Sequence, residues 1–73
     1  MAKKGGNAVY RVTEVIGTSS QSWEDAARNA VKTAASTLRD LRIAEIEKLD
    51  VKIENGKITQ FRARLSLSFK YGA

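Results

Sequence analysis

The segment VIGTSSQSWEDAA, residues 15–27, decides the fold of this chain, because it ends one strand and begins a helix within a few residues. Gly17 suits a backbone that leaves the extended region. Ser22 is expected to be the helix N-cap, with its hydroxyl accepting a hydrogen bond from an N–H group of the first turn. Glu24 and Asp25 then place negative charge where the helix dipole favours it. These residues predict a strand, a tight turn and a capped helix.

The size and composition of the chain point to self-association. A domain of 73 residues buries only about 60% of the surface of its unfolded chain, so a single subunit is marginal. The absence of Cys and His excludes disulfides, thiolate zinc sites and imidazole ligands or bases as a source of stability. We therefore expect a homo-oligomer, built from residues 8–73 as a single domain, with residues 1–7 as a flexible basic tail.

The hydropathy and the charge of the chain limit which cellular environment and which partners are expected. No apolar run approaches the roughly 20 residues that span a bilayer. The first residues, MAKKGG, are not followed by the apolar stretch of a signal peptide, so we expect a cytoplasmic protein. Thirteen basic residues against eight acidic ones give a net charge of +5, which indicates a modest preference for anionic partners.

Periodicity predicts the element order βαββ. A first strand is expected over residues 9–16, and a helix over 23–39, where apolar and alanine positions recur at spacings of three and four. Residues 43–54 are predicted to form a second strand, and its apolar parity changes near Lys48, which indicates either a β-bulge or a change of the buried face. Asn55 and Gly56 form a two-residue hairpin signal.

The last strand has the clearest pattern, because residues 60–71 alternate between apolar and polar side chains without a break. Twelve extended residues span roughly 40 Å at about 3.3 Å each. A helix of about 18 residues covers only roughly 27 Å at 1.5 Å each. The strand therefore outruns its helix, and we expect Leu65, Leu67 or Phe69 to be partly exposed in one subunit and covered by another copy.

These strings together resemble the dodecins, small proteins that form hollow twelve-subunit shells and usually bind flavin. The resemblance runs from YRV and EVIGTS in the first strand, residues 10–19, through SWEDA at residues 22–26. It continues in TLRDL at residues 37–41, ENGK at residues 54–57 and LSFK at residues 67–70. It implies an α+β fold in which a three-stranded antiparallel sheet, in the order βαββ, is partly wrapped around one helix, and a homododecamer as the assembly.

The resemblance also locates ligand positions, and this chain departs from the family at most of them. Flavin-binding dodecins have a tryptophan at the start of the second strand that sandwiches isoalloxazine rings, and here that position is Ile43. A glutamine that bonds the ring edge corresponds to Arg62, and an arginine that holds phosphate corresponds to Asp50. A basic residue near the C-terminus persists as Lys70. The candidate ligand-binding residues are therefore Ile43, Arg62, Lys70 and Arg42, and FMN or riboflavin should bind weakly if at all.

A hard divalent cation is a second candidate ligand, because it takes several oxygen donors. Glu45, Glu47 and Asp50 on the second strand are the likeliest donors, gathered from several subunits, since no EF-hand spacing exists in one chain. Ordinary surface ion pairs are the alternative for these carboxylates.

The remaining function classes are less well supported by the residues. No hydroxyl has a base at fixed spacing, so an enzyme is not expected. Trp23 begins the apolar helix stripe, which favours a core or interface role over ligand stacking. The last strand carries a basic row, formed by Arg62, Arg64 and Lys70. The aromatic residues of that strand have the opposite parity, which argues against binding of single-stranded nucleic acid. The sequence thus predicts a non-enzymatic shell for ligand storage or sequestration. A flavin-storage protein with a rearranged pocket, a calcium-type dodecin and a basic nucleic-acid-associated module are the alternatives.

Overall fold

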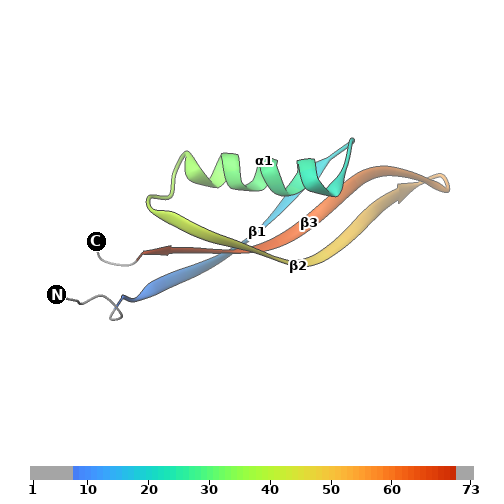
Figure 1. Cartoon of the computed structure of the whole chain (residues 1–73). Helices are drawn as coiled ribbons and strands as arrows, with labels where there is room; N and C mark the ends of the chain where they lie inside the picture. Colours follow the sequence, from blue (N-terminus) through green and yellow to red (C-terminus); the bar gives the residue numbers. More distant parts are fainter. Residues whose placement is uncertain (1–7, 71–73) are drawn as a thin grey trace.

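The computed structural model describes residues 8–70 and has the expected βαββ order (Figure 1). The predicted basic tail, residues 1–7, lies outside the described residues. The three strands form one antiparallel sheet with β3 in the middle, and the helix lies across one face of it (Figure 1). The elements are β1 (Tyr10–Ser19), α1 (Trp23–Ala35), β2 (Leu41–Glu54) and β3 (Lys57–Lys70).

The joint between β1 and α1 has the expected cap. The Ser22 hydroxyl accepts a hydrogen bond from the Asp25 N–H at 3.0 Å. The Ser19 hydroxyl accepts from the Gln21 N–H at 2.9 Å and donates to the Asp25 carboxylate at 2.7 Å. These bonds satisfy polar groups at the turn and at the first helical residues.

We had expected Gly17 to lie in the turn after the first strand. In the structure it lies inside β1, which continues to Ser19. It pairs with Ala63 in the ladder with β3. Its role is steric, because a Cβ at this position would lie 2.1 Å from the Ala26 carbonyl oxygen and 2.7 Å from the Ala30 Cβ. The absence of a side chain allows α1 to approach β1 closely, and the turn begins only after Ser19.

The helix ends at Ala35, four residues before the predicted end at Arg39. Hydroxyl groups at this end bond back to the helix, from Ser36 to the Thr33 carbonyl at 2.6 Å and from Thr37 to the Ala34 carbonyl at 3.3 Å. Asp40 then adopts a left-handed conformation, with φ of 58°, that turns the chain into β2. Leu38 and Leu41 fit the helical spacing, but they reach the core from the connection and from β2.

The β2–β3 hairpin confirms two local predictions. Asn55 and Gly56 at its tip have φ values of 53° and 77°, as a primed two-residue turn requires. A register shift between Ile46 and Lys48 marks the predicted bulge, and it leaves Glu47 without a ladder partner. Because of this extra residue, Glu45 and Lys48 lie on the same face of the sheet.

The core lies between α1 and the centre of the sheet, mainly over β3. Of the three residues expected to be partly exposed in one subunit, Phe69 is half-buried, whereas Leu65 and Leu67 are each only 1% exposed. The helix is short but centred on these leucines, and the hairpin runs well past it (Figure 1). The buried hydrophobic residues are Ala26, Ala30, Ala34, Ala63, Leu65 and Leu67. No helix within residues 8–70 is long and apolar enough to cross a membrane.

Candidate functional site

The sheet face that points away from α1, called here the uncovered face, carries most of the candidate site residues. Their placement follows from the ladder, since ladder partners share a face and alternate residues of β3 return to it. Side chains of β3 at Arg62, Arg64, Ser66 and Ser68 point to this face, because Ala63, Leu65 and Leu67 point to the helix. Ile43, Glu45, Lys48 and Asp50 of β2 pair with those four residues and share their face.

Ile43 lies exposed on the uncovered face opposite Ser68, with 62% of its surface accessible. It borders a small hollow of about 160 Å³ near the start of β2, which Arg42 also lines. The Arg42 guanidinium lies 4.0 Å from the Asp40 carboxylate. This corner of the molecule offers apolar contact and a loosely held cation, and Ile43 supplies no aromatic face for ring stacking.

Arg62 and Asp50 form a two-pronged ion pair across β2 and β3. The Arg62 Nε and Nη2 atoms donate to the two carboxylate oxygens of Asp50 at 2.7 and 3.0 Å. The hydrogen bond from the guanidinium holds the pKa of Asp50 below its ordinary value. The guanidinium of Arg62 and the carboxylate of Asp50 therefore neutralise each other on the uncovered face.

The candidate ligand residues do not converge within one chain. Ile43 pairs with Ser68, while Arg62 lies six residues earlier on β3. That separation is about 20 Å at 3.3 Å per residue. Lys70, which pairs with Tyr10 of β1, lies at the end of β3 away from the hairpin, two residues beyond the ladder partner of Ile43 and far from Arg62. Within one chain, Ile43 and Arg62 are therefore too far apart for one small ligand to touch both side chains.

Trp23 joins the start of α1 to the strand that carries Asp50. Its indole N–H donates to the Asp50 carbonyl oxygen at 3.0 Å. Its ring meets Phe61 edge to face, with centroids 5.2 Å apart and planes at 74°. Trp23 is 40% exposed, so it is a packing residue at the margin of the core. Its proximity to Asp50 could not be read from the helical periodicity, which places Trp23 only on the apolar stripe.

The three carboxylates proposed as cation ligands have different surroundings. Both oxygens of Asp50 are held by Arg62, and Glu47 accepts a short hydrogen bond from the Ser66 hydroxyl. Glu45 makes no hydrogen bond or ion pair within residues 8–70. Glu14 of β1 also pairs with Ser66, so it lies in the same row as Glu45. Across residues 8–70, no three acidic side chains lie close enough together to hold one ion.

The basic and aromatic side chains of β3 lie on opposite faces. Phe61 pairs with Val51 on the helix side, whereas Arg62 and Arg64 point to the uncovered face. Arg64 lies 4.0 Å from the Glu14 carboxylate. Bases could not stack on these aromatic rings while their phosphates met the arginines, so this face lacks a platform for single-stranded nucleic acid.

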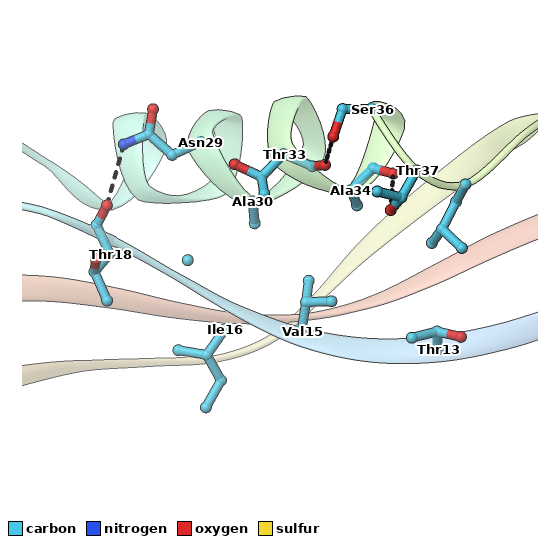
Figure 2. Close-up of a pocket in the computed structure, with 12 residues that line it drawn as sticks. Thr13, Val15, Ile16, Thr18, Asn29, Ala30, Thr33, Ala34, Ser36 and Thr37 are labelled. Atoms are coloured by element: carbon cyan, nitrogen blue, oxygen red, sulfur yellow. Dashed lines mark hydrogen bonds between the residues drawn. The ribbon is translucent and has the colours of Figure 1, made fainter.

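A second hollow separates α1 from the outer edge of β1. It is an open groove of about 630 Å³ (Figure 2). Val15 points from β1 toward the helix in this view, whereas Ile16 points away from it (Figure 2). The Asn29 side chain donates to the Thr18 carbonyl at 3.1 Å and closes one end (Figure 2). The groove is lined by hydroxyl groups and apolar side chains and by no charged side chain. No motif in the sequence predicted it.

Comparison with known proteins gives consistent matches over nearly the whole chain. The model of the dodecin family matches residues 9–72. The calcium dodecin of Mycobacterium tuberculosis is 44% identical over 64 residues, which cover 86% of this chain and 89% of that protein. Its crystal structure, described as calcium chelating with a novel calcium-binding site, has a TM-score of 0.78 at 42% identity and covers 86% of this chain and 90% of its own. A dodecin from Streptomyces coelicolor has a TM-score of 0.87 at 39% identity, with coverage of 94% and 99%.

Proposed function

Since this chain belongs to the dodecin family, we propose that it forms a non-enzymatic homododecameric shell that stores or sequesters a small ligand in the cytoplasm. The observation that carries this proposal is the set of large apolar side chains on β2 that no layer of the same chain covers. Ile43, Ile46 and Leu49 are each at least half exposed. A protein of 73 residues gains its missing burial most economically from other copies of itself.

We propose a divalent cation of the calcium type, rather than flavin, as the ligand. The similarity to a calcium dodecin supports this choice, as does the presence of acidic side chains at Glu45, Glu47 and Asp50. Calcium takes six to eight oxygen ligands, more than one β2 strand supplies, so carboxylates from several subunits would share the ion. Because Arg62 holds Asp50, Glu45 and Glu47 are the more available donors.

The cation proposal predicts that calcium stabilises the assembled protein. An ion that binds only the native assembly at about 100 times its dissociation constant adds about 2.7 kcal/mol to the free energy of unfolding. Thermal unfolding in millimolar calcium, against chelator at matched ionic strength, should show a raised midpoint. Native mass spectrometry of the same sample should report twelve subunits and the bound ions together.

Single amide variants identify the donors. Glu45→Gln, Glu47→Gln and Asp50→Asn should be compared with Glu54→Gln, a control on the same strand whose carboxylate lies 3.6 Å from the Lys52 ammonium. A donor's variant loses the calcium-dependent shift, whereas the control keeps it. A monomeric wild-type protein would contradict the shell, and a melting curve insensitive to calcium would contradict the cation.

We also propose that flavin binds weakly, since the stacking position holds Ile43 and the ring-edge position holds an arginine engaged by Asp50. FMN or riboflavin should bind at least about tenfold more weakly to the wild type than to the double variant Ile43→Trp with Arg62→Gln, a gap of about 1.4 kcal/mol. Quenching of flavin fluorescence on stacking measures both affinities. Strong quenching by the wild-type protein would favour the alternative, a flavin-storage dodecin with a rearranged pocket.

A further inference from the structure

The tip of the β2–β3 hairpin extends well past α1, and no residue of the core lies in it (Figure 1). Every residue from 52 to 59 is exposed. Ile53 and Ile58, which are ladder partners there, keep 63% and 57% of their surface accessible. The ladder also shifts register between Lys52 and Ile53, next to the tip. Because a segment with few buried contacts opens at a low free energy, the tip is expected to open more readily than the rest of the sheet.

The turn at this tip places two groups that can react with each other side by side. Asn55 is followed directly by Gly56, and their φ values are 53° and 77°. Within residues 8–70, the Asn55 side-chain amide makes no hydrogen bond that would hold it in place. The ladder ends at the Glu54–Lys57 pair, so the Gly56 N–H lies outside it. The space around Gly56 is open, since no atom beyond its chain neighbours lies within 4 Å of where a Cβ would be.

We propose that Asn55 is a site of spontaneous deamidation in which the backbone nitrogen of Gly56 is the nucleophile. This nitrogen attacks the side-chain carbonyl carbon Cγ of Asn55, and the new N–Cγ bond closes a succinimide ring. The bond between Cγ and Nδ2 breaks, and the proton of the Gly56 N–H leaves with Nδ2 as ammonia. Water then adds to either carbonyl carbon of the ring and returns a proton to the nitrogen, which gives aspartate or isoaspartate. The reaction needs water and no oxidant or reductant.

Opening of the tip controls this reaction. The closed turn fixes the left-handed backbone of Asn55, whereas ring closure needs rotation about the bond between its Cα and its main-chain carbonyl carbon. The open tip allows this rotation, so the rate follows the population of open molecules. Glycine at position 56 then offers a nitrogen that no side chain obstructs.

Asn29 provides a comparison within the same molecule, because the same chemistry is blocked there. Its side-chain amide donates to the Thr18 carbonyl oxygen at 3.1 Å. The next nitrogen belongs to Ala30, which is 7% exposed and lies within α1, where the hydrogen bonds of the helix hold it. Release of both groups requires α1 to leave the core. Asn55 should therefore deamidate at least about tenfold faster than Asn29, since exposed ends open at a much lower free energy than packed helices.

Deamidation changes the charge and the geometry of the tip. Either product adds a carboxylate next to Glu54 and removes one unit from the net charge of +5. Isoaspartate also carries the main chain through the former side-chain carbon, which lengthens the loop by one CH₂ group. A two-residue primed turn no longer fits that loop, so the end of the hairpin should loosen while α1 and the core keep their structure.

Incubation of the purified protein at mildly alkaline pH, in water labelled with heavy oxygen, tests the proposal. Tandem mass spectrometry of the hairpin peptide should find the label at residue 55 in both aspartate and isoaspartate, with Asn55→Asp as the standard for the first product. Conversion should speed up as the pH rises, because the attacking nitrogen has to lose its proton. Gly56→Ala is the matched variant. Its methyl group meets no other atom of the fold but hinders the nitrogen, so conversion should slow several-fold although the turn is weakened.

Three results would overturn the proposal. The first is conversion of Asn55 no faster than that of Asn29 in the same sample. The second is formation of aspartate without isoaspartate, because direct hydrolysis of the side chain would then bypass Gly56. The third is conversion in the urea-unfolded chain but not in the folded protein, which would show that the closed turn protects Asn55. The test depends neither on the proposed ligand nor on the number of subunits.

Discussion

The helix α1 packs very differently against the two outer strands of the sheet, β1 and β2. α1 approaches β1 most closely near the end of the strand, where Gly17 lies against the Ala26 carbonyl and the Ala30 methyl group. β2 carries large apolar side chains such as Ile46 and Leu49, and the helix leaves them half exposed. The close contact completes a core within the chain. β2 has apolar residues typical of a core but no layer of the same chain to cover them, and the proposed shell would supply that layer from another subunit.

A substitution at Gly17 tests this difference between the two outer strands most directly. Gly17→Ala puts a methyl group 2.1 Å from a backbone oxygen, which cannot rotate away, so α1 has to move off β1. Overpacking of this kind costs about 3 kcal/mol. Urea denaturation at fixed protein concentration measures the loss.

Gly56→Ala is the matched control, since no atom lies within 4 Å of the added methyl group. It should lose only about 1 kcal/mol, because Gly56 has a positive φ that a side chain disfavours. If Gly17→Ala were no more destabilising than Gly56→Ala, the close packing of α1 against β1 at Gly17 would not be important for stability.

Local signals in the sequence were sufficient for most of the fold. The Ser22 cap, the Asn55–Gly56 turn and the bulge before Lys48 each depend on residues close in sequence, and all were predicted. The helix end was wrong, because the apolar spacing continues through Leu38 and Leu41 while the hydroxyls of Ser36 and Thr37 turn back to the helix. Periodicity does not distinguish a helical residue from one that reaches the same core from a neighbouring segment.

The site could not be assembled from the sequence for a different reason. Asp50 and Arg62 are twelve residues apart, and their pairing depends on the register of the hairpin between them. β2 has three register shifts against β3, and each one changes which side chains face each other. Alternation alone therefore placed Arg62 on the correct face without naming its partner. Contacts with another subunit are still harder to predict from the alternation of apolar and polar residues in the sequence.

The smallest expected effect concerns the Asp50–Arg62 pair on the open side of the sheet. Arg62 lowers the pKa of Asp50 in the folded protein, so folding favours the carboxylate over the carboxylic acid. The pair's contribution is present above the pKa of the unfolded chain, about 3.9 for aspartate, and is lost as the pH falls through the lower folded value. The difference in unfolding free energy between the wild type and Asp50→Asn should therefore be positive near neutral pH and shrink toward pH 3. Both side chains are solvent-exposed, and salt should reduce the difference further. Repeating the Asp50→Asn substitution in an Arg62→Met background isolates the pair, because without the guanidinium the pH dependence should disappear. A difference that persisted unchanged in that background would mean that Asp50 acts through its surroundings on β2, including the carbonyl that Trp23 holds, and not through Arg62.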